Sequence, residues 1–257
     1  MVSAGSGAPQ EPSGVGDAQE IERHKRLAAR AAAELVQDGM LVGLGTGSTV
    51  AYLLEALGER ERELGEARFA ATSPATELTA RALGLEVREL DELGELDLAI
   101  DGADQVDPQG WLIKGGGAAH TREKIVAASA RRFVVIVSAE KLVGALTPPL
   151  PLELIGFGVQ STLRRLEQSQ LRAQPSARVG VGSAVASGSE IVQRSPDGGL
   201  IADYLGPVGD PRELEARLSA VAGVIEHGLF EPEMVSLILS GGEDGVVSRA
   251  GAKPATP

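Results

Sequence analysis

The sequence predicts an α/β protein in which a Rossmann-like, doubly wound sheet is joined to a second, smaller α+β lobe. Strand-length apolar runs alternate with helical patterns from about Glu20 to Ser138, as they do where helices cover a mostly parallel sheet. The chain has 43% hydrophobic but only 3% aromatic residues, so its core must be aliphatic, which suits such a sheet. Pro148, Pro149 and Pro151 then interrupt the pattern, and runs of short strands follow, which indicates the smaller lobe.

The first unit begins with an Ala-rich helix at about residues 20–37, which Asp38-Gly39 ends and a buried strand at 40–44 follows. A helix at 49–57 comes next, with Ser48 or Thr49 as its expected N-cap. The remaining expected elements of this unit are strands near 68–72, 87–90, 96–100, 111–114 and 133–138 and helices at 76–83 and 122–130.

The second unit is expected to start near Pro148 and to mix strands with two helices. The start of one helix is marked by Asp210 as N-cap, Pro211 at the first helical position and Glu213 in a capping box. The other expected elements are strands near 152–155, 178–182, 191–194 and 200–205 and a helix at 161–168.

The expected division of the chain follows from these patterns. Strands at 224–227 and 235–240 are expected to rejoin the first sheet. We therefore predict a larger Rossmann-like unit formed by residues 19–147 and 225–250, and a small α+β unit at 148–224. Both ends of the chain, residues 1–18 and 251–257, have the composition of disordered tails.

Composition and charge exclude several classes of function. The 36 acidic and 24 basic side chains give a net charge of −12, which argues against a nucleic-acid partner. No cysteine is available for a disulfide, a thiolate nucleophile or a Cys-ligated metal. No run approaches the roughly 18 apolar residues of a membrane span. Residues 1–18 also lack the basic and apolar regions of a signal peptide, so we expect a cytoplasmic protein without a membrane partner.

The three histidines, His24, His120 and His227, do not have the spacing of metal ligands. Each is expected to be a surface or packing residue. We therefore predict no metal site.

The glycine-rich segment at 43–49, Gly-Leu-Gly-Thr-Gly-Ser-Thr, lies between a predicted strand and a predicted helix. Backbone N–H groups at such a helix start, together with three hydroxyls, suit a phosphate. A dinucleotide fingerprint fails, because Ser48 replaces a glycine and Thr72-Ser73 replaces the acidic residue after the next strand. No Gly-Lys-Ser or Gly-Lys-Thr follows, so the segment is not a P-loop either. A tight turn without a ligand is the alternative interpretation.

A second motif, Asp101-Gly102-Ala103-Asp104, directly follows the predicted buried strand at 96–100. Carboxylates at the carboxyl end of a strand lie where open α/β sheets bind ligands. The alternative is an Asx-turn that only ends the strand.

A third motif runs from Lys114 through Gly115, Gly116 and Gly117 to a helix start that contains Glu123. Consecutive glycines cost backbone entropy and pack nothing, so they indicate a close approach to a ligand or unusual dihedral angles. Glu123 is a candidate catalytic base in this setting. Its alternative role is to complement the helix dipole from the first turn.

Several ordered segments together carry a resemblance to a known family. They are VGLGTGST at 42–49, DGAD at 101–104, KGGGAA at 114–119, TREKI at 121–125 and SAEK at 138–141, with weaker matches at 149–153, 223–230 and 243–246. This set resembles ribose-5-phosphate isomerase, type A, over the chain from about Ile21 to Val247. Two departures are Gln105, where the family usually has glutamate, and SPDGG at 195–199, which replaces an Asn-Gly-Asn-type turn.

The resemblance implies interconversion of D-ribose 5-phosphate and D-ribulose 5-phosphate in the pentose phosphate pathway, by a homodimer that needs no cofactor. Glu123 matches the family's proton acceptor, which moves a proton between C2 and C1 through an enediolate. Lys114 and the Gly115–Gly117 amides would stabilise the enediolate oxygens, and Asp101 with Lys114 would open the sugar ring. Asp104 would orient hydroxyl groups.

The resemblance also implies a set of residues that bind the sugar and its phosphate. This set consists of Thr46, Gly47, Ser48, Thr49, Gly102, Ala103, Lys141 and Lys25. A net charge of −12 is compatible with an anionic substrate, because a few lysines and a helix N-terminus create a local positive pocket.

Two alternatives from other classes stay open at this point. A non-catalytic sugar-phosphate sensor would need a DNA-binding module, for which the segment before Ile21 is too short. An enzyme similar to CoA transferases would use a glutamate as acyl nucleophile and form a covalent adduct.

Overall fold

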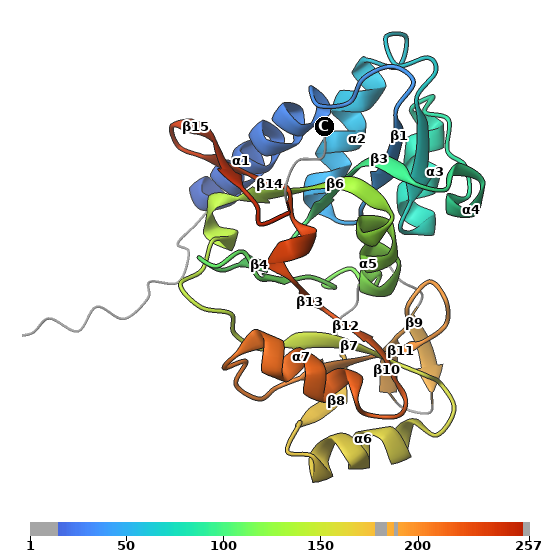
Figure 1. Ribbon diagram of the computed structural model, residues 1–257, viewed down its shortest axis with the longest axis vertical. Helices are drawn as coiled ribbons and strands as arrows, with labels where there is room; N and C mark the ends of the chain where they lie inside the picture. The colour runs from blue at the N-terminus through green and yellow to red at the C-terminus, as the bar shows by residue number, and fades with distance from the viewer. Residues whose placement is uncertain (1–14, 178–183, 188–189, 254–257) are drawn as a thin grey trace, which may run out of the picture.

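The computed structural model describes residues 15–177, 184–187 and 190–253, and its largest sheet has six strands (Figure 1). Their order across the sheet is β15-β14-β6-β3-β1-β2. The strands are β1 (Leu41–Leu44), β2 (Arg68–Ala71), β3 (Leu96–Gly102), β6 (Ala130–Ser138), β14 (Leu237–Gly242) and β15 (Gly245–Ala250). The five strands from β14 to β2 are parallel, and β15 runs antiparallel to β14.

Helices cover both faces of this sheet. They are α1 (Val15–Ala33), α2 (Ser48–Glu59) and α3 (Pro74–Ala82) on one face and α5 (His120–Ala128) on the other. Alternation along β6 explains the two layers, because successive side chains of a strand point to opposite faces. Val134 and Ile136 belong to the core with α1 and α2, whereas Phe133 and Val135 belong to the core with α5. The predicted doubly wound α/β class is confirmed.

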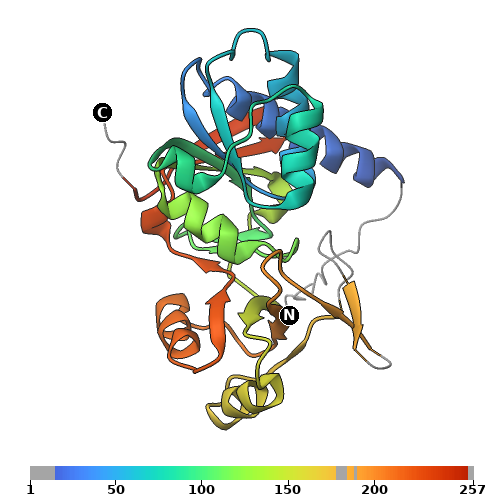
Figure 2. The ribbon, with the colours of Figure 1, turned by 90° about the vertical axis from the view of Figure 1, so that its right-hand side faces the viewer.

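The smaller lobe is built on a four-stranded antiparallel sheet of order β12-β7-β11-β8. Its elements are β7 (Leu150–Leu154), α6 (Val159–Gln168), β8 (Ala173–Pro175), β11 (Leu200–Tyr204), α7 (Pro211–Ser219) and β12 (Val224–His227). A separate antiparallel pair is formed by β9 (Ala184–Ser187) and β10 (Glu190–Gln193). Figure 2 shows this lobe below the six-stranded sheet. The prediction of a small α+β lobe is therefore confirmed.

A three-stranded antiparallel sheet lies between the two larger sheets in Figure 1. It consists of β13 (Leu229–Phe230), β5 (Leu112–Ile113) and β4 (Gln105–Val106). Elsewhere in the described residues, short helical segments are α4 (Leu90–Leu93), η1 (Ala139–Lys141) and η2 (Pro232–Met234). Lys114 directly follows β5, and its backbone N–H donates to the carbonyl of Gly228 over 2.8 Å. The small sheet thus anchors a candidate site residue.

The first helix differs from its prediction at both ends. It begins at Val15, so residues 15–18 are helical instead of part of a tail, while the rest of the predicted tail, residues 1–14, lies outside the described residues. It ends at Ala33, because Leu35 and Val36 already bond to carbonyls three residues back, at Ala32 and Ala33. Such i to i−3 bonds tighten the last turn of a helix.

Two predicted strands also differ. At 87–90 only Val87 bridges to Phe69, after which Leu90–Leu93 turns into α4 and Gly94, at φ 70°, ends it. The strand at 224–227 pairs with β7 of the small lobe and does not rejoin the first sheet, whereas the following strand, β14, does. The strand predicted at 178–182 lies outside the described residues. Periodicity predicts a strand but not its partner.

Helix starts follow the sequence in one case and not in another. The Asp210 side chain accepts from the N–H groups of Arg212 and Glu213, as predicted for an N-cap. For α2, however, the N-cap is Gly47 at φ 126°, no side chain caps the helix, and the predicted caps Ser48 and Thr49 lie inside its first turn.

In the described part of the chain, no helix combines the length and the apolar character that a membrane crossing requires.

Candidate active site

A cavity of about 530 Å³ lies where β1 and β3, adjacent in the sheet, end. The chain leaves β1 toward β2 on one side and returns to β3 on the other, and ligands of open α/β sheets bind at such a switch point. The sequence-predicted residues that line it are Lys25, Thr46, Gly47, Ser48, Thr49, Gly102, Ala103, Asp104, Lys114, Gly115, Gly116, Gly117, Glu123 and Lys141. Asp101 does not line the cavity but contacts Lys114.

Three charged side chains meet in the buried wall of this cavity. The Lys114 ammonium lies 2.8 Å from Oδ2 of Asp101 and 3.0 Å from Oε2 of Glu123. It also donates to the carbonyl of Gly102 over 2.7 Å. All three charged side chains are less than 5% exposed. A lysine between two carboxylates in a dry site is suited to holding and passing protons.

The position of Asp101 depends on a glycine in the neighbouring loop. A side chain at Gly45 would place its Cβ 1.9 Å from the Asp101 carboxylate carbon, so only glycine fits there. Asp101 Oδ1 accepts from the N–H groups of Thr46, over 3.1 Å, and Gly102, over 2.7 Å. These bonds come from the next residue and from the β1–α2 loop, whereas the Asx-turn of the alternative interpretation uses the N–H two residues on. The other oxygen of Asp101 binds Lys114.

Burial sets the charge state of these groups. The pKa of Glu123 is raised to about 8, mainly because burial desolvates the carboxylate; the Asp101 charge also raises it, whereas Lys114 lowers it. Burial also raises the pKa of Asp101, against the influence of Lys114. For Lys114 burial lowers the pKa, but the two carboxylates outweigh it, so the net pKa is raised. A carboxyl group with a pKa near neutrality can both accept and return a proton.

The glycine run beside Lys114 is held in an unusual backbone conformation. Gly115 has φ 107°, and a Cβ there would lie 2.8 Å from Nδ1 of His120. The N–H of Gly116 donates to Asp104 Oδ2 over 2.8 Å. A side chain at Gly117 would approach Thr46. Asp104, which the resemblance associates with sugar hydroxyls, thus also fixes the loop.

The start of α2 forms the opposite part of the cavity. Gly47 offers no capping side chain, so no side chain caps the first N–H groups of α2, and Ser48 and Thr49 of this first turn line the cavity. Lys25 and Lys141 line the same cavity and add positive charge. Unpaired helix N–H groups and lysines together bind anions such as phosphate.

Lys25 is oriented by a carboxylate and a tyrosine. Its ammonium lies 2.7 Å from Oε1 of Glu22, and Oε2 of Glu22 accepts from the Tyr52 hydroxyl over 2.5 Å. Tyr52 belongs to α2, so this chain of contacts ties the lysine of α1 to α2. The hydrogen bonds from Lys25 and Tyr52 lower the pKa of Glu22, which keeps it ionised.

Two residues that line the cavity were not predicted from the sequence. Ile21 is one helical turn before Lys25 on α1, and that spacing is the signal that places both on one face. Glu140 lies in the quoted SAEK segment, and its carboxylate accepts from the Ser138 hydroxyl over 2.5 Å. A motif quoted for its lysine alone gave no reason to select the glutamate.

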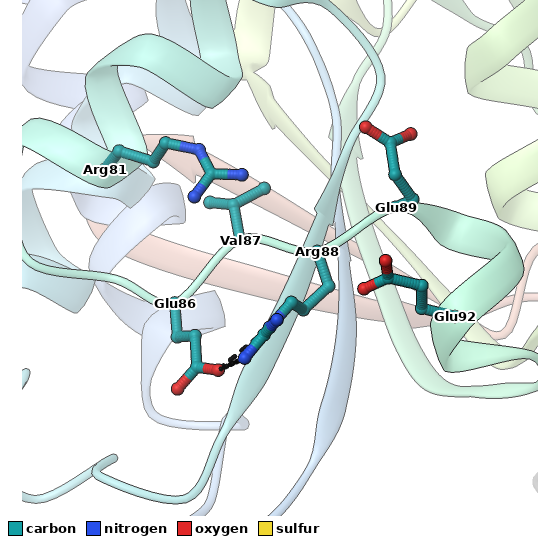
Figure 3. A pocket seen from close by; sticks show the side chains of 6 residues that line it. All are labelled: Arg81, Glu86, Val87, Arg88, Glu89 and Glu92. Carbon is teal, nitrogen blue, oxygen red and sulfur yellow. Dashed lines mark hydrogen bonds and ion pairs between the residues drawn. The ribbon is translucent and has the colours of Figure 1, made fainter.

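A different pocket, of about 420 Å³, is lined by Arg81, Glu86, Val87, Arg88, Glu89 and Glu92. Figure 3 shows Arg88 paired with Glu86, and the two groups are 2.5 Å apart. This pocket contains none of the predicted site residues, and both side chains of the pair are more than a third exposed. It has the character of an ordinary charged surface.

The histidines lie away from any metal-like cluster. Burial and, to a smaller extent, the charge of Lys124 lower the pKa values of His120 and His227 to about 3. His24 is 7% exposed and contacts Arg23. Within the residues that the structure describes, no group of three His, Asp or Glu side chains is arranged to hold a metal ion.

Comparison with known proteins adds independent information. Residues 68–245 match the family model described as ribose 5-phosphate isomerase A (phosphoriboisomerase A). The chain is 43% identical over 225 residues to the ribose-5-phosphate isomerase A of Methanosarcina acetivorans, which covers 87% of this chain and 92% of that protein.

Solved structures agree with this match. A D-ribose-5-phosphate isomerase in complex with phospho-erythronic acid has a TM-score of 0.80 and 33% identity, covering 90% of this chain and 99% of its own. The ribose 5-phosphate isomerase A of Methanocaldococcus jannaschii has a TM-score of 0.78 and 34% identity, covering 88% and 97%. With the match running through the buried Asp101, Lys114 and Glu123, the chain belongs to the ribose 5-phosphate isomerase A family.

Proposed function

We propose that this chain interconverts D-ribose 5-phosphate and D-ribulose 5-phosphate with Glu123 as the base that carries a proton between C2 and C1. Family membership makes the chain a sugar isomerase of the pentose phosphate pathway. The observation that supports the role of Glu123 is its place in the cavity wall, 3% exposed and 3.0 Å from the Lys114 ammonium. A sensor or an acyl-transferring enzyme, the two alternatives, receives no support from these relatives.

The proposed reaction begins when Glu123 takes the proton from C2 of the open-chain aldose. The C–H electron pair forms the C1–C2 double bond, and negative charge moves onto O1. Lys114 and the amides of Gly115 and Gly117 stabilise this charge, because fixed donors in a dry site act strongly on it. Glu123 then returns the proton to C1, while the proton of the O2 hydroxyl passes to the O1 oxyanion, so that O2 becomes the ketone oxygen and O1 becomes a hydroxyl.

Ring opening is proposed to use Lys114 and Asp101. Lys114 lines the cavity, whereas Asp101 is buried behind it and acts through it by keeping the lysine charged and oriented. Asp104, Gly102 and Ala103 contribute to the sugar subsite beside them.

The phosphate is proposed to bind at the start of α2, on Thr46, Gly47, Ser48 and Thr49, with Lys141 and Lys25 supplying charge. The uncapped helix end and the two lysines support this assignment. A solved relative binds phospho-erythronic acid, which also joins a phosphate to a short polyol chain.

We also propose that the chain acts as a homodimer in the cytoplasm and does not bind nucleic acid. Large apolar side chains on its surface, among them Phe157 at 90% exposure, support a partner copy. The net charge of −12 supports the absence of a nucleic-acid partner.

The proposed base is tested by Glu123→Gln. This change keeps the size and most hydrogen bonds but removes the base, so kcat should fall by about 10²- to 10⁴-fold. In deuterated water, partial label incorporation by the unchanged enzyme and its loss in the variant would accompany this fall. Glu77→Gln, in an exposed pair on α3, is the control and should keep kcat. A folded Glu123→Gln enzyme within a few-fold of normal activity would refute the proposal.

A further inference from the structure

The turn at 195–199, which departs from the family pattern, packs against the first turn of α5. Nε of Arg122 donates to Oδ2 of Asp197 over 2.8 Å, and Nη2 donates to Oδ1 over 2.6 Å. These two parallel bonds join the small lobe to the residue directly before Glu123. Bidentate pairs of this kind fix direction as well as distance.

A second link lies beneath this pair. Glu153 of β7 is 2% exposed, and its two carboxylate oxygens accept from the hydroxyls of Thr121 and Ser195. Thr121 is two residues before Glu123, and Ser195 begins the turn. The Glu153 charge also acts on Arg122 and raises its pKa together with Asp197, which contributes more. One buried carboxylate therefore holds both sides of the contact.

The turn itself is shaped around Glu153. A Cβ at Gly199 would lie 2.1 Å from Oε1 of Glu153, so a larger residue cannot be accommodated there without movement. Gly198 has φ 86°, a left-handed conformation that favours glycine. The Gly199 N–H donates to the Ser195 hydroxyl oxygen over 3.1 Å, which closes the turn.

The start of α5 has no side-chain cap of its own. Its N-cap is Ala119. The chain before it turns through positive φ angles at Gly115 and Ala118. Contacts from outside the helix, such as those of Thr121 and Arg122, therefore help to fix this turn and with it the Glu123 side chain.

We propose that Thr121, Arg122, Glu153, Ser195 and Asp197, here called the interlobe clamp, form a positioning device for Glu123. The clamp holds the first turn of α5 so that the Glu123 carboxylate stays beside Lys114 and above the reacting carbons. Through the clamp, turnover depends on the small lobe, although this lobe supplies none of the proposed reacting groups. This inference rests on the proposed role of Glu123.

A purely structural role predicts a different result. Arg122 and Asp197 have side chains that are 38% and 51% exposed, and exposed ion pairs add little to the free energy of unfolding. A small displacement of a catalytic base, by contrast, strongly lowers turnover. Loss of the pair should therefore reduce kcat without a matching loss of stability.

The test is a double-mutant cycle with Arg122→Ala, Asp197→Ala and the double variant. Each single change should lower kcat about tenfold, with KM for ribose 5-phosphate changed less than about twofold, because the phosphate subsite is elsewhere. The double variant should be no slower than the slower single variant, since both remove one contact. Asp197→Glu, which keeps the carboxylate, should restore part of the lost kcat.

A matched control is the exposed pair of Arg131 and Glu95, whose atoms lie 2.9 Å apart beyond the far end of α5. Arg131→Ala and Glu95→Ala should leave kcat unchanged. A second readout is the isotope effect with ribose 5-phosphate deuterated at C2, which should increase in the clamp variants because proton transfer becomes slower. Thermal unfolding checks that all variants are folded.

Three results would overturn the clamp. They are an unchanged kcat in both single variants, effects that multiply in the double variant, or a loss of kcat that follows a loss of thermal stability. Failure of the clamp is distinguishable from failure of the proposed function. If Glu123→Gln abolishes turnover while the clamp variants keep it, only the clamp is wrong, whereas an active Glu123→Gln enzyme refutes the base itself.

Discussion

Lys114 is the residue that lets two carboxylates share one dry site. Asp101 and Glu123 are each less than 5% exposed, and without a cation between them both would bind protons. The ammonium holds Asp101 at 2.8 Å and Glu123 at 3.0 Å. Glu123 nevertheless keeps a pKa raised to about 8, because desolvation outweighs the lysine.

The raised pKa predicts the pH dependence of the reaction. A base must be ionised to accept a proton, so kcat/KM should rise with pH up to about 8, the value for Glu123, and level off above it. Asp101→Asn removes a negative neighbour, which favours the ionised form, so the inflection should move to lower pH. Asp104→Asn should move it less, since Asp104 raises the pKa of Glu123 less than Asp101 does.

Rate profiles of kcat/KM between about pH 5.5 and 9.5 measure these shifts for all three enzymes. An inflection that stays in place or moves upward in Asp101→Asn would contradict the electrostatic account of the site.

Motifs selected the residues of the site but not the contacts among them. Asp101, Lys114 and Glu123 come from three different segments of the chain. Their spacing in the sequence does not predict that Nζ of Lys114 reaches both carboxylates. Asp104 was associated with sugar hydroxyls, but its bond to the Gly116 N–H depends on how the glycine loop folds back. Ile21 is in the cavity lining, and the only sequence signal for this is its position one helical turn before Lys25.

Among the elements, α2 has an N-terminus whose structure is related most directly to the proposed function. Its predicted caps, Ser48 and Thr49, lie inside the helix, and Gly47 takes the cap position at a φ of 126°. Serine and threonine are in general favoured at N-caps, but this preference predicted the wrong cap residue for α2. A helix end without its own cap keeps N–H groups available for a ligand.

The proposed phosphate subsite predicts a specific effect of Lys141→Ala. The variant should have a KM for ribose 5-phosphate that is about tenfold or more higher, with a smaller change in kcat, since the phosphate is remote from C1 and C2. D-ribose, which lacks the phosphate, is the control substrate, and its slow turnover should not change. Steady-state kinetics with both sugars measure this, and an unchanged KM for the phosphate would remove Lys141 from the subsite.

Element order was predictable from the sequence far better than element pairing. The strand at 224–227 forms as expected, but it pairs with β7 instead of the first sheet. Nothing in its apolar pattern distinguishes these partners. The strand predicted at 87–90 does not form, for a local reason. Asp91 and Glu92 lie in the first turn of a short helix, which Gly94 ends.

At the scale of the whole molecule, the division into units at 19–147 with 225–250 and at 148–224 remains a prediction. The hydrophobic core of the small lobe extends beyond the second of these ranges. It includes Trp111 and Ile113 at β5 and Leu229 at β13, which pack with Leu218 of α7. Neighbouring residues of the same strands, Leu112 and Phe230, belong to the core with α5, so the three-stranded sheet is shared by both cores. Lys114 directly follows this sheet.

A shared core predicts that both lobes unfold together. Trp111, the single tryptophan, is 6% exposed in the small-lobe core, so its fluorescence in urea reports on that core. Far-UV circular dichroism reports on the whole chain, and isomerase activity reports on the cavity at the larger sheet. All three should show one transition with the same midpoint, which is the mark of a two-state domain.

Leu218→Ala sharpens this last test. Leu218 is fully buried in the small-lobe core, so its truncation should cost about 2 to 5 kcal/mol of unfolding free energy. Because Trp111 and Lys114 directly flank β5, the midpoints of fluorescence, circular dichroism and activity should all move down by the same amount. A variant whose fluorescence midpoint falls while the other two keep their values would show that the lobes unfold independently. In that case the core contacts around β5 do not couple the small lobe to the site.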